Sequence, residues 1–245
     1  MIRHLLLVTA LLAGAAHASD DEEPLDAPWE GDVELGFYLS TGSSHSQLWL
    51  GELDMQKQYE DRRYEVAIDG RYERQKHEED SRYSVSSARY NAMFKAETYL
   101  VPDADYAFGM AKQRHNRFGP NRRTDVLIAG LGHTFDFGND NYLSLDAGPG
   151  MRWRLQREGR TQREGVVYLA QEMAWQLNPY TSLHQKASVE ANGDVGVEQF
   201  EISIKNKLSG ALALKVGVLT SRTNRSPAEA KESDTETRLT LVYHF

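Results

Sequence analysis

The sequence predicts an all-β protein, namely a transmembrane antiparallel up-and-down β-barrel of about twelve strands. The chain begins with an export-type leader, and from residue 30 to its end apolar and polar residues alternate with a period of two. Aromatic residues also recur beside one set of turns. Alternating runs of about ten residues that are separated by turn residues are typical of outer-membrane barrels. The prediction holds although the mean hydropathy is negative, because only alternate residues of such a barrel face lipid.

Residues 1–18 match a secretory signal peptide. Arg3 supplies a positive start, Leu5 to Ala16 is almost entirely apolar, and Ala16-His17-Ala18 fits the small-x-small cleavage pattern. The apolar run is shorter than the roughly 20 residues that a membrane-spanning helix needs. We therefore expect cleavage after Ala18, with an uncleaved anchor as the alternative.

Residues 19–29 are acidic, lack periodicity and contain two prolines, so they predict a flexible leader before a barrel over residues 30–245. Without Arg3, 27 basic residues remain of the 28 in the whole sequence, against 36 acidic residues. This balance disfavours nucleic acid as a partner, because phosphate binding needs a basic face. The absence of cysteine excludes disulfides and thiolate metal sites.

The strands are defined by alternation such as that of Val33, Leu35, Phe37 and Leu39 with polar or small neighbours. An even number of strands brings both termini to the periplasm. The facing of runs 46–59 and 163–176 is ambiguous. The predicted strands are 30–41, 46–59, 63–76, 82–99, 104–115, 124–136, 141–156, 163–176, 180–192, 196–208, 210–223 and 234–245.

The connections after even-numbered strands are uniformly short, and periplasmic turns of outer-membrane barrels are short. Aromatic residues flank these turns, and amphipathic rings prefer the membrane–water interface. We expect a periplasmic aromatic girdle of Tyr59, Tyr64, Tyr99, Tyr106, Phe137, Tyr142, Trp175, Tyr180 and Tyr243.

A secreted soluble sandwich or barrel would also show alternation, but several runs reach a dozen residues, against a usual strand length of about 5–6. The last strand closes on Phe245. A terminal aromatic residue on an alternating strand resembles the signal read by the barrel assembly machinery, so we expect that machinery and periplasmic chaperones as partners during biogenesis.

The polar residues of the strands predict a charged lumen of both signs. A barrel of about twelve strands falls between filled and wide-channel barrels, so a narrow pore and a plugged barrel both remain open. We expect a lumen that is structural first and conducts weakly at most. The predicted lumen charges are Glu34, Asp69, Arg71, Arg89, Lys95, Glu97, Arg152, Arg154, Lys186, Glu201, Lys205 and Arg238.

One predicted outer loop is basic, with Arg114, Arg117, Arg122 and Arg123 close together. Guanidinium groups bind phosphate bidentately, so contact with lipopolysaccharide is one interpretation and a solvated loop is the other.

No catalytic or metal-binding motif stands out, so we expect no enzyme activity and no cofactor. A Ser–His hydrolase is the competing class, with His45 beside Ser43, Ser44 or Ser46, or His133 near Ser144, as candidate pairs. The histidines show no H-E-x-x-H spacing.

Several short motifs resemble a bacterial domain family of unknown function, the salt-induced outer-membrane proteins of the YdiY type. They are Trp29 to Phe37, Ser40 to Ser44, Gly130-Leu131-Gly132, Leu145 to Gly150, Arg163-Glu164 and the last strand. The family's usual Gly-Asn-Ser is Gly42-Ser43-Ser44 here, which affects only a loop. The resemblance implies an outer-membrane barrel in the Gram-negative envelope and a link to salt or osmotic stress. We expect a narrow solute or ion channel in contact with outer-membrane lipids, with a structural barrel or a lipid-modifying hydrolase as alternatives.

Overall fold

The computed structural model describes residues 28–40, 44–77, 82–193, 195–225 and 232–245. The predicted signal peptide, 1–18, and most of the predicted leader, 19–29, lie outside the described residues. Within the described ranges, no helix is long and apolar enough to cross a membrane.

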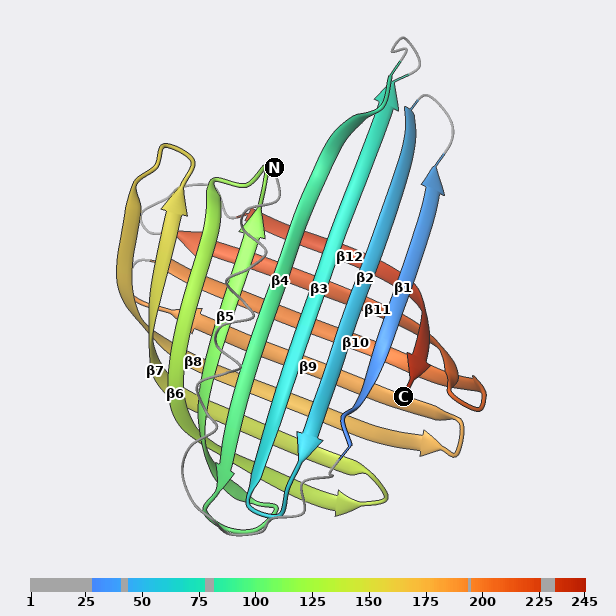
Figure 1. Cartoon of the computed structure of the whole chain (residues 1–245), viewed down its shortest axis with the longest axis vertical. Coiled ribbons are helices and arrows are strands. Elements are labelled where there is room, and N and C mark those ends of the chain that lie inside the picture. The colour runs from blue at the N-terminus through green and yellow to red at the C-terminus, as the bar shows by residue number, and fades with distance from the viewer. Residues whose placement is uncertain (1–27, 41–43, 78–81, 194, 226–231) are drawn as a thin grey trace.

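The described residues form twelve antiparallel strands that close into one barrel, which confirms the predicted fold (Figure 1). Each boundary lies within three residues of its predicted position, and the largest difference is at the start of β6. The strands are β1 (Glu30–Ser40), β2 (Ser44–Gln58), β3 (Arg62–His77), β4 (Ser84–Tyr99), β5 (Asp105–Asn116), β6 (Asn121–Gly138), β7 (Asn141–Gln156), β8 (Thr161–Asn178), β9 (Thr181–Ala191), β10 (Val195–Ser209), β11 (Leu212–Arg225) and β12 (Glu232–His244).

Both ends of the described barrel chain lie together. Gly31 and Phe245 exchange two backbone hydrogen bonds of 3.1 and 3.0 Å. We call this end of the barrel the proximal end and the other the distal end. Proximal connections are tight, as in the β6–β7 turn, where Asn139 and Asp140 have φ of 54° and 61°. Two successive residues with positive φ suit a two-residue hairpin, and Asn and Asp tolerate that conformation.

Several distal connections are shorter than predicted, because the strands continue into the expected loops; the β5–β6 connection spans 117–120 instead of 116–123. β6 begins at Asn121 instead of 124, and a register shift between Asn121 and Arg123 accommodates the extra residues. A bulge of this kind lets a strand continue past an irregularity.

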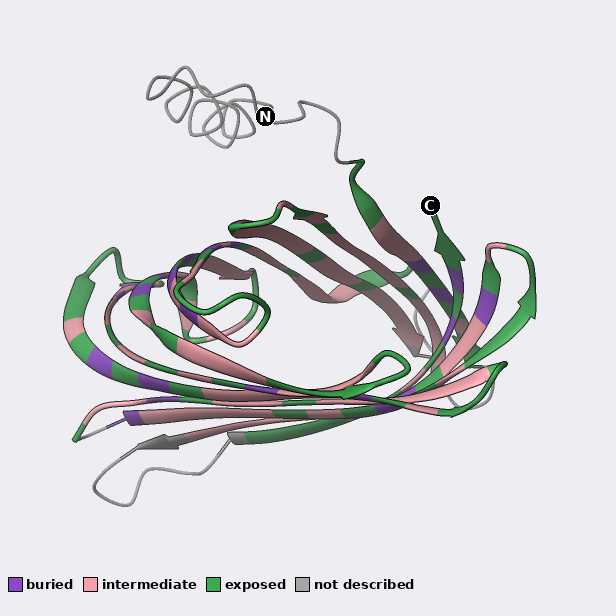
Figure 2. Ribbon diagram, turned by 90° about the horizontal axis from the view of Figure 1, so that it is seen from below, coloured by how far each residue is buried: buried purple, intermediate pink, exposed green. Residues whose placement is uncertain are grey.

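The two faces of the wall have opposite character, as the alternating burial along the strands in Figure 2 shows. Leu35 and Leu131 are 65% and 63% exposed on the outside, whereas Glu97 and Arg152 are 2% and 1% exposed on the inside. Soluble domains bury apolar groups and expose charges, so this barrel is inverted relative to them.

The two strands of ambiguous facing carry apolar residues on both faces. In β2, Leu50 pairs with Arg71, whose side chain points inward, and Trp49 on the outer face is 49% exposed. In β8, Tyr168 is buried inside and Leu169 is 54% exposed outside. The side chains still alternate between the inner and outer faces, but hydropathy does not alternate with them.

Candidate functional site in the barrel interior

The interior is the candidate site, because charged side chains from the whole wall meet there. The inner-face register places all twelve predicted lumen residues inside, where all but Asp69 form ion pairs and six pair with strands that are not their neighbours. The twelve are Glu34, Asp69, Arg71, Arg89, Lys95, Glu97, Arg152, Arg154, Lys186, Glu201, Lys205 and Arg238.

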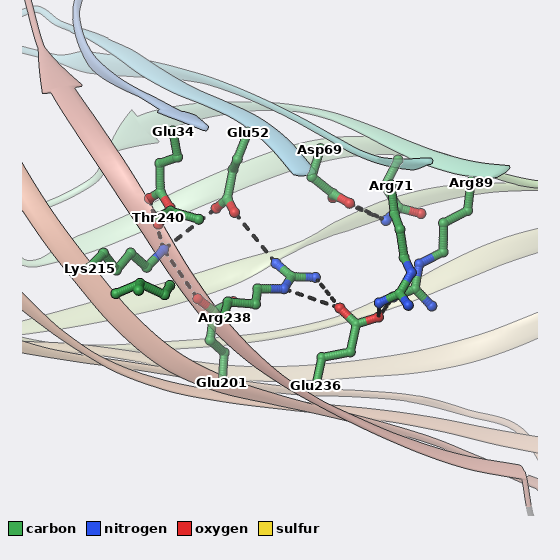
Figure 3. Close-up of polar contacts among 12 residues, drawn as sticks. Glu34, Glu52, Asp69, Arg71, Arg89, Glu201, Lys215, Glu236, Arg238 and Thr240 are labelled. Atoms are coloured by element: carbon green, nitrogen blue, oxygen red, sulfur yellow. Dashed lines mark hydrogen bonds and ion pairs between the residues drawn. The ribbon is translucent and has the colours of Figure 1, made fainter. Parts of the chain in front are cut away.

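Lys215 on β11 lies among three carboxylates (Figure 3). Its Nζ is 2.9 Å from Glu34, 3.3 Å from Glu201 and 3.8 Å from Glu52. The oxygens of Glu34 and Glu52 also lie close to those of Asp54, in an arrangement that could hold a cation. The Lys215 ammonium group already supplies positive charge at two of these three acids.

Glu236 on β12 is the common partner of three arginines (Figure 3). It lies 2.6 Å from Arg71 on β3 and 3.1 Å from Arg238, and it also pairs with Arg89 on β4. Arg238 is in turn 3.6 Å from Glu52. The contacts of Glu236 with Arg71 and Arg89 cross the interior, because β1 and β2 separate β12 from β3.

A second group of charges surrounds Lys95. Its Nζ lies 2.7 Å from both Glu97 and Asp146, and Arg63 pairs with Glu97 at 2.9 Å. The hydroxyl of Tyr106 donates to Asp146 at 2.8 Å. Every charge of this group therefore has an opposite charge or a hydrogen bond, as a closed interior requires.

Toward the distal end, two glutamates form ion pairs with three arginines. Glu164 lies 2.7 Å from Arg152 and 2.9 Å from Arg154, and Glu190 lies 2.5 Å from Arg114. Arg114 is thus an interior residue of β5 and does not belong to the basic loop where it was predicted. Arg114 stands within the predicted strand 104–115, and the alternation that places Tyr106, Phe108 and Met110 inside also places Arg114 on the inner face.

Part of the inner wall is apolar. Tyr106, Phe108 and Met110 on β5 are buried against residues of β6 and β8. The glycines of β6 make room for them, since a Cβ at Gly132 would lie 2.3 Å from the Tyr106 ring and one at Gly130 would lie 2.8 Å from Phe108. The Gly130-Leu131-Gly132 motif therefore lets aromatic rings lie flat on the inner wall.

Three residues of the predicted aromatic girdle lie inside the barrel. Tyr106 is fully buried, Tyr142 donates to Glu172 at 3.1 Å, and Tyr99 lines the cavity. Adjacent turn residues alternate in facing, so flanking a turn does not place both rings outside. The remaining ring-bearing positions at the proximal end are Tyr59, Tyr64, Phe137, Trp175, Tyr180 and Tyr243, and the rings of Phe137 and Trp175 lie 5.8 Å apart.

A cavity of about 800 Å³ occupies the proximal half of the barrel. It is lined by residues at the proximal rim, among them Asp103, Asp140 and His244, and reaches inward to Arg238 and Tyr168. Among the residues that the structure describes, twelve Asp and Glu line it, against six Lys and Arg. The cavity is therefore a net acidic vestibule at the end that holds the termini.

The candidate Ser–His pair at His133 is not assembled. His133 lies beside Phe135 on the outer face with its Nδ1 2.6 Å from Asp105, whereas Ser144 is buried inside and contacts Tyr106. His45 and Ser46 are consecutive in β2 and so face opposite sides.

Sequence reasoning missed several members of the interior network. Glu52 and Asp54 lie on β2, where inward Leu48 and Leu50 obscured the alternation. Glu236 and Lys215 stand at ordinary polar positions, and their importance arises from partners three strands away, Arg71 for Glu236 and Glu52 for Lys215.

Comparison with known proteins agrees with the fold and the motifs. Over 256 aligned residues, the chain is 25% identical to the uncharacterized protein YdiY of Escherichia coli K12, covering 98% of this chain and 95% of that protein. An outer-membrane channel of Pseudomonas putida F1 matches with a TM-score of 0.54 and 10% identity, covering 93% of this chain and all of that chain. The NanC porin matches with a TM-score of 0.52 and 9% identity, covering 87% and 98%. A family model described as "protein of unknown function, DUF481" matches residues 33–245, and the chain therefore belongs to this family.

Proposed function

We propose that the protein is a narrow, cation-preferring channel in the outer membrane of a Gram-negative bacterium, with its proximal end in the periplasm. The acidic vestibule of about 800 Å³ carries this proposal. A cavity lined mainly by one sign of charge concentrates ions of the opposite sign. The apolar outer face, with Leu35 and Leu131 largely exposed, supports insertion in a bilayer.

The distal half restricts passage in this proposal. The ion pairs of Glu236 and Glu190 cross the interior beyond the vestibule. Conductance is then small, and it depends on movement of these side chains. Export by the predicted signal peptide and a role under salt stress belong to the same proposal, and they rest on the leader sequence and the family resemblance.

The test is single-channel recording of the refolded mature chain in planar bilayers under a KCl gradient, with the reversal potential as the readout. We expect small, discrete conductance steps with a cation preference. Replacing Asp103, Asp136 and Asp140 together with Asn should reduce that preference, and Asn tolerates the positive φ at Asp103 and Asp140. A matched control is Glu60→Gln with Asp61→Asn, at the same end but outside the cavity lining.

A folded barrel without conductance steps would favour the structural alternative. Such a result would mean that the interior ion pairs act as a permanent plug. An anion preference, or equal loss of selectivity in the control variant, would contradict the proposed role of the vestibule.

A further inference from the structure

One seam of the barrel wall is paired over only part of its length. The described residues of β1 and β12 share four register pairs, from Asp32 with His244 to Leu35 with Leu241. Each of the other eleven seams has eleven or more pairs. Figure 1 shows β1 and β12 running in different directions away from the C-terminus.

Side chains hold the two strands where the backbone pairing ends. The Tyr38 hydroxyl donates to the carbonyl oxygen of Leu239 at 2.8 Å and accepts a hydrogen bond from the Leu239 backbone N–H. Inside the barrel, Arg238 and Glu236 reach across the seam to residues of β2, β3 and β4. Among the described residues, the part of the seam without register pairs extends from Gly36 toward the distal end, and Tyr38 lies within it.

The wall beside this seam is apolar on both faces. Phe37 and Trp49 are 48% and 49% exposed outside, with ring centroids 4.2 Å apart. Leu48 and Leu50 of β2 are on the inner face, in register with Glu73 and Arg71. Two leucine side chains that face only water and charges remove no apolar surface from water, so they do not stabilise the barrel. If a hydrocarbon chain covers them, their apolar surface is buried and the contact is favourable.

We propose that the distal part of the β1–β12 seam is a side portal that admits the acyl chain of a membrane lipid to a site over Leu48 and Leu50. The proposal rests on the membrane location proposed above. Backbone N–H and C=O groups of a strand edge that face lipid without a hydrogen-bond partner cost free energy. The Tyr38 hydroxyl supplies such a partner, and its hydrogen bonds can break when the portal opens. The hydrogen bonds between Tyr38 and Leu239 would hold the portal closed.

The test uses the fact that the chain has no cysteine, so that single labels can be placed cleanly. Leu50→Cys carries a bimane fluorophore inside the barrel beside the seam, and Leu48→Cys is a second such site. Ser188→Cys on β9, which lines the vestibule, is the interior control, and Leu35→Cys is the lipid-facing control. The labelled barrels are refolded into phosphatidylcholine vesicles whose lipids carry a nitroxide quencher on the acyl chain.

We expect the labels at Leu50 and Leu48 to be quenched nearly as strongly as the label at Leu35, and the label at Ser188 to be quenched little. Adding Tyr38→Phe should increase quenching at Leu50 further. If the Leu35 label is quenched but the labels at Leu50 and Leu48 behave like the one at Ser188, the portal is ruled out. If the Leu35 label of a folded, heat-modifiable barrel is not quenched either, the membrane location itself fails.

Discussion

The side-chain hydroxyl of Tyr38 on β1 takes the place of a strand partner for Leu239 on β12, because it bonds both the carbonyl oxygen and the N–H of that residue. In every other seam the backbone of the neighbouring strand supplies such bonds over at least eleven register pairs. Where the ladder between the first and last strands ends, this side chain therefore continues the closure of the barrel.

Tyr38→Phe should destabilise the barrel by about 1–3 kcal/mol, since both backbone groups of Leu239 lose a partner in a low-dielectric wall. Reversible urea unfolding in lipid vesicles measures this change. Tyr72→Phe, on the outer face of β3 and 41% exposed, is the matched control and should cost less than about 0.5 kcal/mol. Equal losses in the two variants would show that the Tyr38 hydroxyl has no special role in closure.

Gly132→Ala should be strongly destabilising, because its Cβ would lie 2.3 Å from two atoms of the Tyr106 ring and 2.5 Å from Asp146. Overpacking of this kind costs about 1–3 kcal/mol, and displacing Tyr106 would also disturb its bond to Asp146. Gly109→Ala, where a Cβ meets nothing within 4 Å, is the control on the neighbouring strand. Urea unfolding should separate the two, and a Gly132→Ala barrel as stable as Gly109→Ala would contradict the packing described.

The strands were predictable from sequence because alternation and turn residues are local patterns along the chain. The even number of strands followed from the requirement that both termini lie at the same end of the barrel. The inward placement of the predicted charges follows from the same alternation. Tyr106 was misplaced because its position beside a turn was weighted above the alternation of β5, which places it inside, where Gly132 of the next strand makes room for its ring. The partial seam could not be predicted either, since it depends on the relative directions of β1 and β12, which are some 200 residues apart in the chain.

Glu236→Gln should both weaken the barrel and change its permeation. The variant removes the charge that Arg71, Arg89 and Arg238 share, and breaking a buried ion pair from one side costs about 3–5 kcal/mol. The three guanidinium groups then add positive charge beyond the vestibule. The reversal potential should therefore shift in the direction that indicates a weaker cation preference. Glu73→Gln is the matched control.

Glu73 pairs with Arg71 at 2.8 Å, and Arg71 keeps Glu236 when this pair is lost. We therefore expect a smaller loss of stability and little change in selectivity from Glu73→Gln. If both glutamine variants shift the reversal potential equally, the cluster around Glu236 does not control permeation.

The distal rim retains a basic patch of Arg117, Arg122 and Arg123 after Arg114 is assigned to the interior. Arg123 pairs with Asp125 but is half exposed, at 51%. We predict that this patch binds lipopolysaccharide phosphates, because exposed guanidinium groups form bidentate bonds with phosphate.

Replacing Arg117, Arg122 and Arg123 with Ser should weaken lipopolysaccharide association several-fold at low salt, measured by co-purification or by binding to lipopolysaccharide-containing vesicles. The effect should fade as salt is raised, since it arises from exposed charges. Arg62→Ser, at the proximal rim and paired with Asp61, removes one exposed arginine from the opposite end and should leave binding unchanged. Unaltered association of the triple variant at matched salt would mean that the distal arginines are only solvated, and an equal effect of Arg62→Ser would mean that net charge decides binding.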